Sequence, residues 1–212
     1  CGVTAAGGVM KHPIRIQNLG GASAVILHRP HPIVQALDRQ LHAIGLHVTE
    51  SWPELGPEAL GADFVFFDAD MGHDEQFPWS LGQNPMPMIA LIGSEAPGRI
   101  EWSLRAGAHA QLLKPVGDSG VYATLLIARQ AFDAQRAQAA EIADLRRRLD
   151  ERRTVVRAIS LLMGHGAKDD AAAYDQLRQM AMSWRVSFEE AATRIVARTA
   201  DMKDSDDRRN RG

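Results

Sequence analysis

Two charged residues directly follow predicted strands, and they are the strongest candidates in this sequence for a functional site. Asp68 comes directly after the apolar residues 64–67, and Lys114 comes directly after residues 111–113. Open α/β sheets build their sites at the carboxyl ends of the strands, so both side chains are expected at one edge. A carboxylate there is a hard oxygen ligand of the kind that Mg²⁺ prefers. The simpler interpretation is a carboxylate that Lys114 or Arg29 neutralises.

Other reactive residues do not show the spacing of known sites. None of the eight histidines has the His-x-x-x-His spacing or the cysteine partner that zinc sites use. The single cysteine, Cys1, has no evident base beside it and cannot form an internal disulfide. No glycine-rich phosphate loop is present. The sequence therefore predicts neither a metal nor a cofactor.

The charges divide into an acidic first part and a basic second part. Residues 1–128 contain 7 Lys and Arg against 12 Asp and Glu, whereas residues 129–212 contain 17 against 14. This division favours a sensor joined to a segment that binds a polyanion; a solvated arginine-rich helix face is the alternative. No apolar stretch approaches the ~18 residues of a membrane span, and no secretory signal is recognisable. We therefore expect a cytoplasmic protein that does not bind membranes.

Short apolar runs and helical spacings indicate how the first part folds. The expected strands are residues 24–27, 46–49, 64–67, 88–92 and 111–113. Apolar residues at steps of three and four predict helices over 34–44 and 100–108. Strands that alternate with helices predict an α/β fold, a doubly wound five-stranded parallel sheet over residues 22–127. Residues 1–21, with five glycines, are expected to be a flexible tail or added residues, with Met10 a candidate start.

A stretch without Gly or Pro, residues 121–163, predicts one long helix. Its apolar residues alternate in steps of three and four, as in a coiled coil, with Arg152 as a polar interruption. The residues expected to dimerise are Ile142, Leu145, Leu149 and Val156. We predict a homodimer through a coiled-coil linker helix at 128–152; packing of the stripe within its own chain is the alternative.

The charges beside this stripe would act in opposite ways in a parallel pair of chains. Glu141 and Arg146 would attract one another across the pair, whereas Arg148 and Arg153 would repel.

Breakers and capping residues predict a three-helix bundle at residues 153–200. Residues 164–166 (Gly-His-Gly) end the long helix, and Asp169 or Asp170 can cap a second one. Residues 187–190 (Ser-Phe-Glu-Glu) form a capping box that opens a third. The charged residues 201–212 are expected to be a disordered tail.

The residues of this bundle resemble the ANTAR module of the AmiR and NasR antitermination regulators. The resemblance covers roughly residues 153–199 and is carried by Leu161-Leu162-Met163, Asp170, Ala173-Tyr174, Leu177-Arg178 and Ala181-Met182. It implies a three-helix RNA-binding unit preceded by a dimerising coiled coil. One departure is Ala158-Ile159-Ser160, where family members usually carry Ala-Lys-Gly; Arg157 or Lys168 can replace the missing lysine.

The first part resembles a response-regulator receiver domain, and the overall layout is most similar to the AmiR branch of the family. In receivers an aspartate after the third strand accepts a phosphoryl group, a lysine pairs with its oxygens, and an acidic pair after the first strand holds Mg²⁺. Asp68 and Lys114 match the first two features, but residues 28–31 (His-Arg-Pro-His) supply no carboxylate. Without Mg²⁺, little offsets the charge that develops during phosphoryl transfer. We therefore predict a pseudo-receiver in which Asp68 is not usefully phosphorylated.

The resemblance implies a non-enzymatic RNA-binding antiterminator. It would stabilise a hairpin in a structured mRNA leader, and a ligand-sensing regulatory protein would bind the receiver-like domain or the coiled coil. The candidate RNA contacts are Arg157, Lys168, Arg178, Arg185 and Arg194. The alternatives are a phosphorylation-controlled response regulator that binds DNA, and a protein-interaction adaptor.

Overall fold

Five parallel strands form a single sheet in the first part of the chain, in the order β2-β1-β3-β4-β5. The strands are β1 (Ser23–Leu27), β2 (His47–Ser51), β3 (Phe64–Asp68), β4 (Met88–Ile92) and β5 (Ala108–Leu113). Every residue of β3 and β4 is buried, because a parallel sheet is covered on both faces and its central strands are apolar throughout. The predicted doubly wound α/β fold is confirmed.

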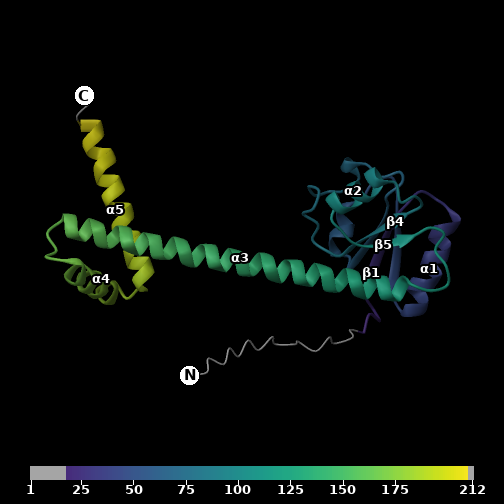
Figure 1. Ribbon diagram of the computed structural model, residues 1–212, viewed down its shortest axis with the longest axis horizontal. Coiled ribbons are helices and arrows are strands. Elements are labelled where there is room, and N and C mark those ends of the chain that lie inside the picture. Colours follow the sequence, from purple (N-terminus) through teal and green to yellow (C-terminus); the bar gives the residue numbers. More distant parts are fainter. Residues whose placement is uncertain (1–17, 210–212) are drawn as a thin grey trace, which may run out of the picture. The chain divides into compact units, whose positions relative to one another are not determined.

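The computed structural model describes residues 18–209, with side chains described for residues 18–199. The chain divides into two units, the first ending at Arg136 and the second beginning at Ala137. The helix α3 (Val121–Gly164) contributes to both units (Figure 1). No helix in the described part is long and apolar enough to cross a lipid bilayer.

Helices pack on both faces of the sheet in the first unit. The core on one face includes residues of α1 (Pro32–Ile44) and the first turns of α3. The core on the other face includes Ala106, with residues of α2 (Pro97–Arg105) packed against it. Two short 3-10 helices, η1 (Pro57–Gly61) and η2 (Asp74–Gln76), lie in the connections before and after β3. α1 ends at Gly45, whose φ of +100° is a conformation that favours glycine.

Two boundaries of the first unit differ from the sequence predictions. Leu19, predicted to belong to the tail 1–21, packs in the core and is 5% exposed. Next to it, the N–H of Gly21 donates to the carbonyl of Gly45, so the domain begins before residue 22. Ala108 was predicted to lie on a helix but begins β5, because Gly107, at φ +95°, turns the chain after α2. Residues 1–17 of the predicted tail lie outside the described residues.

The second unit is a bundle of the last turns of α3 with α4 (Asp170–Trp184) and α5 (Phe188–Arg209). Asp169 caps α4, since its carboxylate accepts from the N–H of Ala172 at 2.8 Å. Ser187 caps α5 by accepting from the N–H of Glu190 at 3.1 Å. α5 extends into the segment 201–212 that the sequence predicted as a tail, and residues 210–212 lie outside the described part.

Alanine dominates the buried positions of this bundle. Its fully or nearly buried core consists of Ala158, Leu162, Ala173, Leu177, Ala181, Ala191 and Ala192. Small side chains allow the helix backbones to approach closely. Tyr174, on the same helix as Ala173 and Leu177, is 47% exposed and lies against the ring of Phe188.

Candidate functional site

The carboxyl ends of β1, β3 and β5 bring three polar side chains into one cluster in the first unit. Asp68 ends β3 and is 1% exposed, His28 follows β1, and Lys114 follows β5. The Lys114 Nζ lies 2.6 Å from Asp68 Oδ1, and His28 Nε2 lies 3.3 Å from Asp68 Oδ2. The structure therefore brings the two predicted site residues, Asp68 and Lys114, together.

Lys114 has an acceptor for each of its three ammonium N–H groups. Besides Asp68, its Nζ lies 3.0 Å from Asp70 Oδ2 and 3.2 Å from His28 Nε2. Asp70 in turn accepts from the N–H of Gly93 at 2.8 Å. Arg29, the other cation that the sequence offered to neutralise Asp68, is exposed and forms no ion pair with it. The cation in contact with Asp68 is therefore Lys114, and its donors are fully used inside the cluster.

The environment keeps His28 neutral and Asp70 ionised. Burial is the main cause that lowers the pKa of His28, and the Lys114 charge lowers it further. The Nδ1 atom of the neutral ring donates to the carbonyl of Arg29 at 2.7 Å, which leaves Nε2 free to accept from Lys114. Burial raises the pKa of Asp70, but hydrogen bonds from Lys114 and Gly93 outweigh it, so that pKa is lowered.

This donor set does not fit the magnesium ion that working receivers use. Mg²⁺ requires oxygen ligands in near-octahedral geometry, whereas the cluster presents an imidazole after β1 and an ammonium between its two carboxylates. Within residues 18–199, no group of three or more His, Cys, Asp or Glu side chains is arranged to hold a metal. No chemical step through Mg²⁺ follows from this site.

His28 and Asp70 are members of this cluster that the sequence analysis did not assign to the site. A signal for Asp70 was present in the run Asp68-Ala69-Asp70, because alternate residues of an extended chain share a side. His28 occupies the position after β1 that the sequence analysis recognised only as lacking a carboxylate.

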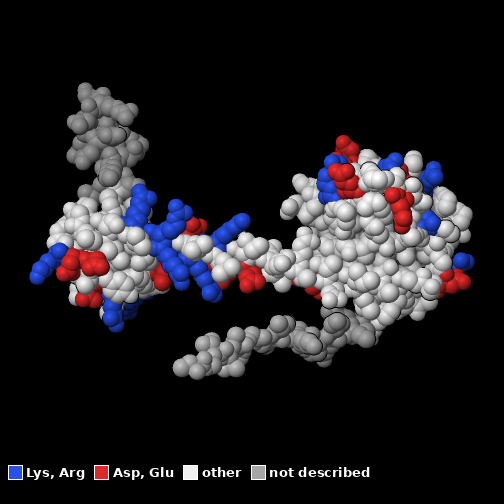
Figure 2. All heavy atoms as spheres, viewed as in Figure 1, with Lys and Arg blue, Asp and Glu red and all other residues white. Residues whose placement is uncertain are grey.

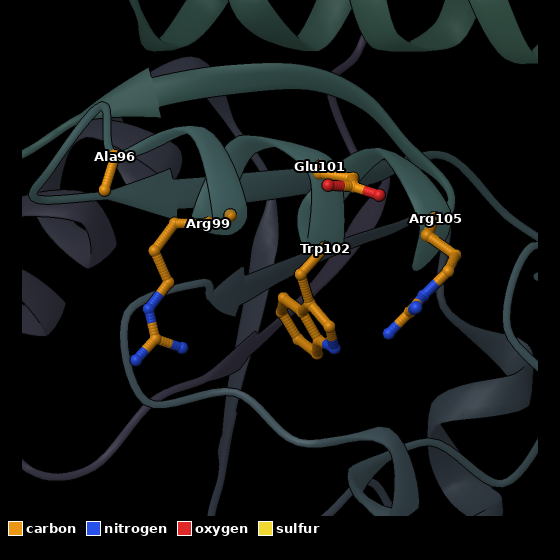
Figure 3. Close-up of a pocket in the computed structure, with 6 residues that line it drawn as sticks. Ala96, Arg99, Glu101, Trp102 and Arg105 are labelled. Carbon is orange, nitrogen blue, oxygen red and sulfur yellow. The ribbon is translucent and has the colours of Figure 1, made fainter.

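A separate hollow of about 490 Å³ lies along α2. Arg99, Trp102 and Arg105 project from the same side of the helix toward it (Figure 3). The indole N–H of Trp102 donates to Asp74 at 2.8 Å, which holds the ring between the two guanidinium groups. Sequence analysis did not predict this surface, although steps of three along one helix place these residues on one face.

The five candidate RNA contacts are all exposed and all belong to the second unit. Arg157 lies on α3, Lys168 in the turn before α4, Arg178 on α4, Arg185 at the end of α4 and Arg194 on α5. Arg194 is engaged within the chain, since it pairs with Glu190 at 2.6 Å and its guanidinium lies 5.9 Å from the Trp184 ring centroid. The five residues therefore lie on all three helices of the bundle and on the turn between the first two.

The predicted dimerisation residues form an exposed apolar stripe on α3. Ile142, Leu145, Leu149 and Val156 are between 48% and 63% exposed. Packing within the same chain, the alternative weighed from the sequence, therefore does not cover them. Ile159, further along the helix, is partly buried against the core of the bundle.

Two family models match the chain. Residues 22–129, just over half of the 212 residues, match the family described as AmiR, N-terminal. Residues 143–196 match the ANTAR domain. The aliphatic amidase regulator of Pseudomonas aeruginosa is 24% identical over 164 residues, which cover 76% of this chain and 84% of that protein.

Solved receiver structures are also similar to parts of the chain. One is ShkA Rec1 in complex with c-di-GMP, at 22% identity, with 54% of this chain and 94% of that chain covered and a TM-score of 0.40. Another is a response regulator from Thermotoga maritima, at 19% identity, 53% and 98% coverage and a TM-score of 0.39. By the matches to the two family models, the chain belongs to the AmiR/NasR-type ANTAR antitermination regulators.

Proposed function

We propose that this chain binds a structured mRNA leader and stabilises an antiterminator hairpin that excludes the terminator stem. The observation that carries the proposal is the ANTAR match over residues 143–196, which includes all five exposed candidate contacts. Proteins recognise RNA largely through backbone, shape and unpaired loop bases. Guanidinium groups suit this task because they bind phosphates with two parallel hydrogen bonds.

Dimerisation provides two such bundles in one particle. The stripe Ile142, Leu145, Leu149 and Val156 is exposed in the single chain and has coiled-coil spacing, so a second copy of α3 would bury it. Two linked bundles can engage two RNA loops at once, and the second contact then gains from a high effective concentration. The proposed RNA-binding species is therefore the homodimer.

The receiver-like unit controls the protein without phosphoryl transfer. Asp68 is buried, its carboxylate contacts Lys114 and His28, and the cluster does not fit Mg²⁺. Control then comes from a ligand-sensing regulatory protein, as the resemblance implies. The face of α2 with Arg99, Trp102 and Arg105 is our candidate for its contact surface, since Arg and Trp are enriched in protein interfaces.

Binding of the full-length chain to fluorescein-labelled RNA with two stem-loops, compared with duplex DNA of equal length, tests the proposed function. We expect the RNA to bind at least about tenfold more tightly at low salt, where phosphate contacts are strongest. Preference for the duplex would instead support the DNA-binding regulator. If the chain binds neither the RNA nor the duplex DNA at low salt, the result would support the protein-interaction adaptor. Transcription through the leader in vitro, with and without the protein, then measures read-through of the terminator.

A further inference from the structure

The part of α3 that enters the bundle is rich in arginine. Residues 144–157 contain six arginines and no lysine, against three acids. Figure 2 shows Lys and Arg side chains gathered over this part of α3. Arginine is the cationic side chain best suited to binding phosphate, because its guanidinium group is planar, rigid and weakly hydrated. The composition of this segment is therefore typical of a phosphate-binding surface.

Two of these arginines use most of the acidic groups nearby. Arg147 pairs with Asp144 and, at 2.7 Å, with Glu151. Arg148 pairs with the other oxygen of Asp144 at 2.7 Å. In each of these exposed ion pairs the two partners are three or four residues apart on the same helix. Few acidic side chains are then left to pair with the remaining arginines.

The other arginines of the segment are available to a ligand. Arg153 is 85% exposed and only approaches Asp150, at 4.0 Å. Within the part of the chain whose side chains are described, no acid forms an ion pair with Arg146, Arg152 or Arg157. Arg152, Arg153 and Arg157 line a surface hollow of about 410 Å³.

The spacing gives this surface a defined length. Arg146, Arg153 and Arg157 are seven and four residues apart, so they lie on one side of the helix. The eleven helical steps from Arg146 to Arg157 span about 16 Å at ~1.5 Å per residue. This row ends at Arg157, one of the five candidate RNA contacts, and extends from it along α3 toward Arg146.

We propose that the surface formed by Arg146, Arg152, Arg153 and Arg157 binds RNA phosphates. This binding in turn strengthens the pairing of two chains. The inference rests on the proposed function, namely a homodimer that binds RNA. It adds Arg146, Arg152 and Arg153 to the candidate contact Arg157, all within the residues that match the ANTAR domain. It also couples the equilibrium of RNA binding to the equilibrium of dimerisation.

Repulsion within the dimer provides this link. In a parallel pair Arg148 and Arg153 face one another, and Arg152 interrupts the apolar stripe between Leu149 and Val156. Like charges therefore weaken the free dimer at this point. Phosphates bound there neutralise the repulsion, and because such coupling is reciprocal, RNA favours the dimer as much as the dimer favours RNA.

The double variant Arg152→Gln/Arg153→Gln tests the proposal in the full chain. Gln keeps a high helix propensity, so the helix content seen by circular dichroism should not change. The matched control is Arg29→Gln/Arg39→Gln, which removes two exposed arginines from the first unit. Anisotropy of the labelled two-stem-loop RNA gives the Kd at several salt concentrations, and sedimentation gives the dimer Kd with and without RNA.

We expect the double variant to bind the RNA at least about tenfold more weakly and to lower the slope of log K against log salt by about two to four. Without RNA the same variant should dimerise more tightly than the wild type, a change that a merely structural role would not produce. Arg152→Lys/Arg153→Lys should keep the repulsion and most of the salt slope. The control should stay within about twofold of the wild type in both assays.

An RNA Kd and salt slope equal to those of the wild type would overturn the proposal, as would a weakened free dimer. An equal loss in the Arg29/Arg39 control would show a general charge effect and overturn it too. If the wild type itself binds no RNA at low salt, the proposed function fails. If the wild type binds RNA and the double variant binds it equally well, only the inference about the arginines of α3 is contradicted.

Discussion

At the scale of single residues, the cluster around Lys114 determines what the receiver-like unit can do. Its ammonium contacts Asp68, Asp70 and His28, so all three of its N–H groups are engaged within the cluster. Asp68 itself is 1% exposed. A phosphoryl donor would therefore have to reach a buried carboxylate without the metal that normally offsets the developing charge.

Incubation with a small-molecule phosphodonor and Mg²⁺ should leave Asp68 unmodified. The reason is that an imidazole and an ammonium lie beside Asp68, where Mg²⁺ would require oxygen ligands. Intact-mass spectrometry measures the adduct, and a phosphorylatable receiver domain run in parallel shows that the donor is active. A stoichiometric adduct that disappears in Asp68→Asn would contradict this expectation.

Replacing Lys114 with Ala should lower the free energy of unfolding by about 3–5 kcal/mol, since it leaves the Asp68 carboxylate buried without its cation. Urea denaturation followed by circular dichroism measures the loss. Lys168→Ala removes an exposed lysine and is the control, with an expected change within about 0.5 kcal/mol. Equal losses in the two variants would contradict the role of Lys114.

Acidification should destabilise the first unit through two histidines. Burial lowers the pKa of His28 and of His109. As the pH falls through about 6.5, the unfolded chain binds protons that the folded chain does not, so the free energy of unfolding decreases. Denaturation at a series of pH values measures this slope, and His28→Gln/His109→Gln should flatten it. A slope unchanged in the double variant would assign the effect to other groups.

At the scale of secondary-structure elements, side-chain caps define the helices of the bundle. α4 begins at a carboxylate cap and α5 at a hydroxyl cap. The capping box predicted for α5 is only half formed, because the Glu190 carboxylate pairs with Arg194. Each cap satisfies an N–H that the helix cannot satisfy itself.

Asp169→Ala should cost the second unit about 1 kcal/mol of stability, because the N–H of Ala172 loses its acceptor. Thermal unfolding monitored by circular dichroism measures the shift. The neighbouring Asp170→Ala is the control; it removes a charge from the first turn and should cost only about 0.3–1 kcal/mol. The assignment of the cap would be wrong if Asp170→Ala cost more than Asp169→Ala.

At the scale of the whole molecule, α3 belongs to both the receiver-like unit and the three-helix bundle, and it carries an apolar stripe that the described part of its own chain leaves exposed. Under the proposed function, a signal received by the receiver-like unit would alter RNA binding by changing how two chains pair. This control would require no phosphoryl transfer in that unit.

Leu149→Glu should convert the dimer to a monomer, since it places two like charges in the seam. RNA with two stem-loops should then bind about 100-fold more weakly through the loss of effective concentration, whereas RNA with one stem-loop should be little affected. Leu104→Glu is the matched control, because Leu104 and Leu149 are 59% and 58% exposed. Sedimentation measures the oligomeric state. If the Leu149→Glu variant remains a dimer, the stripe is not the dimer interface.

The sequence by itself determined the order of elements and the family. Apolar steps of two, three and four are local properties, so they predicted the strands, the long helix and the bundle without knowledge of distant contacts. The errors lie at boundaries. Leu19 joined the core and Ala108 began a strand because packing against the rest of the sheet, not local spacing, decides where an element ends.

Only the tertiary structure decided which polar groups meet. Residues 28, 70 and 114 are far apart in sequence, and their convergence on one ammonium depends on strand order and side-chain direction. The sequence supplied Asp68 and Lys114 as a pair, but it could not show that His28 takes up the third donor of the lysine. Likewise, the apolar stripe on α3 is exposed because no other described segment of the chain packs against it. The spacing of residues in the sequence cannot show whether another segment packs there.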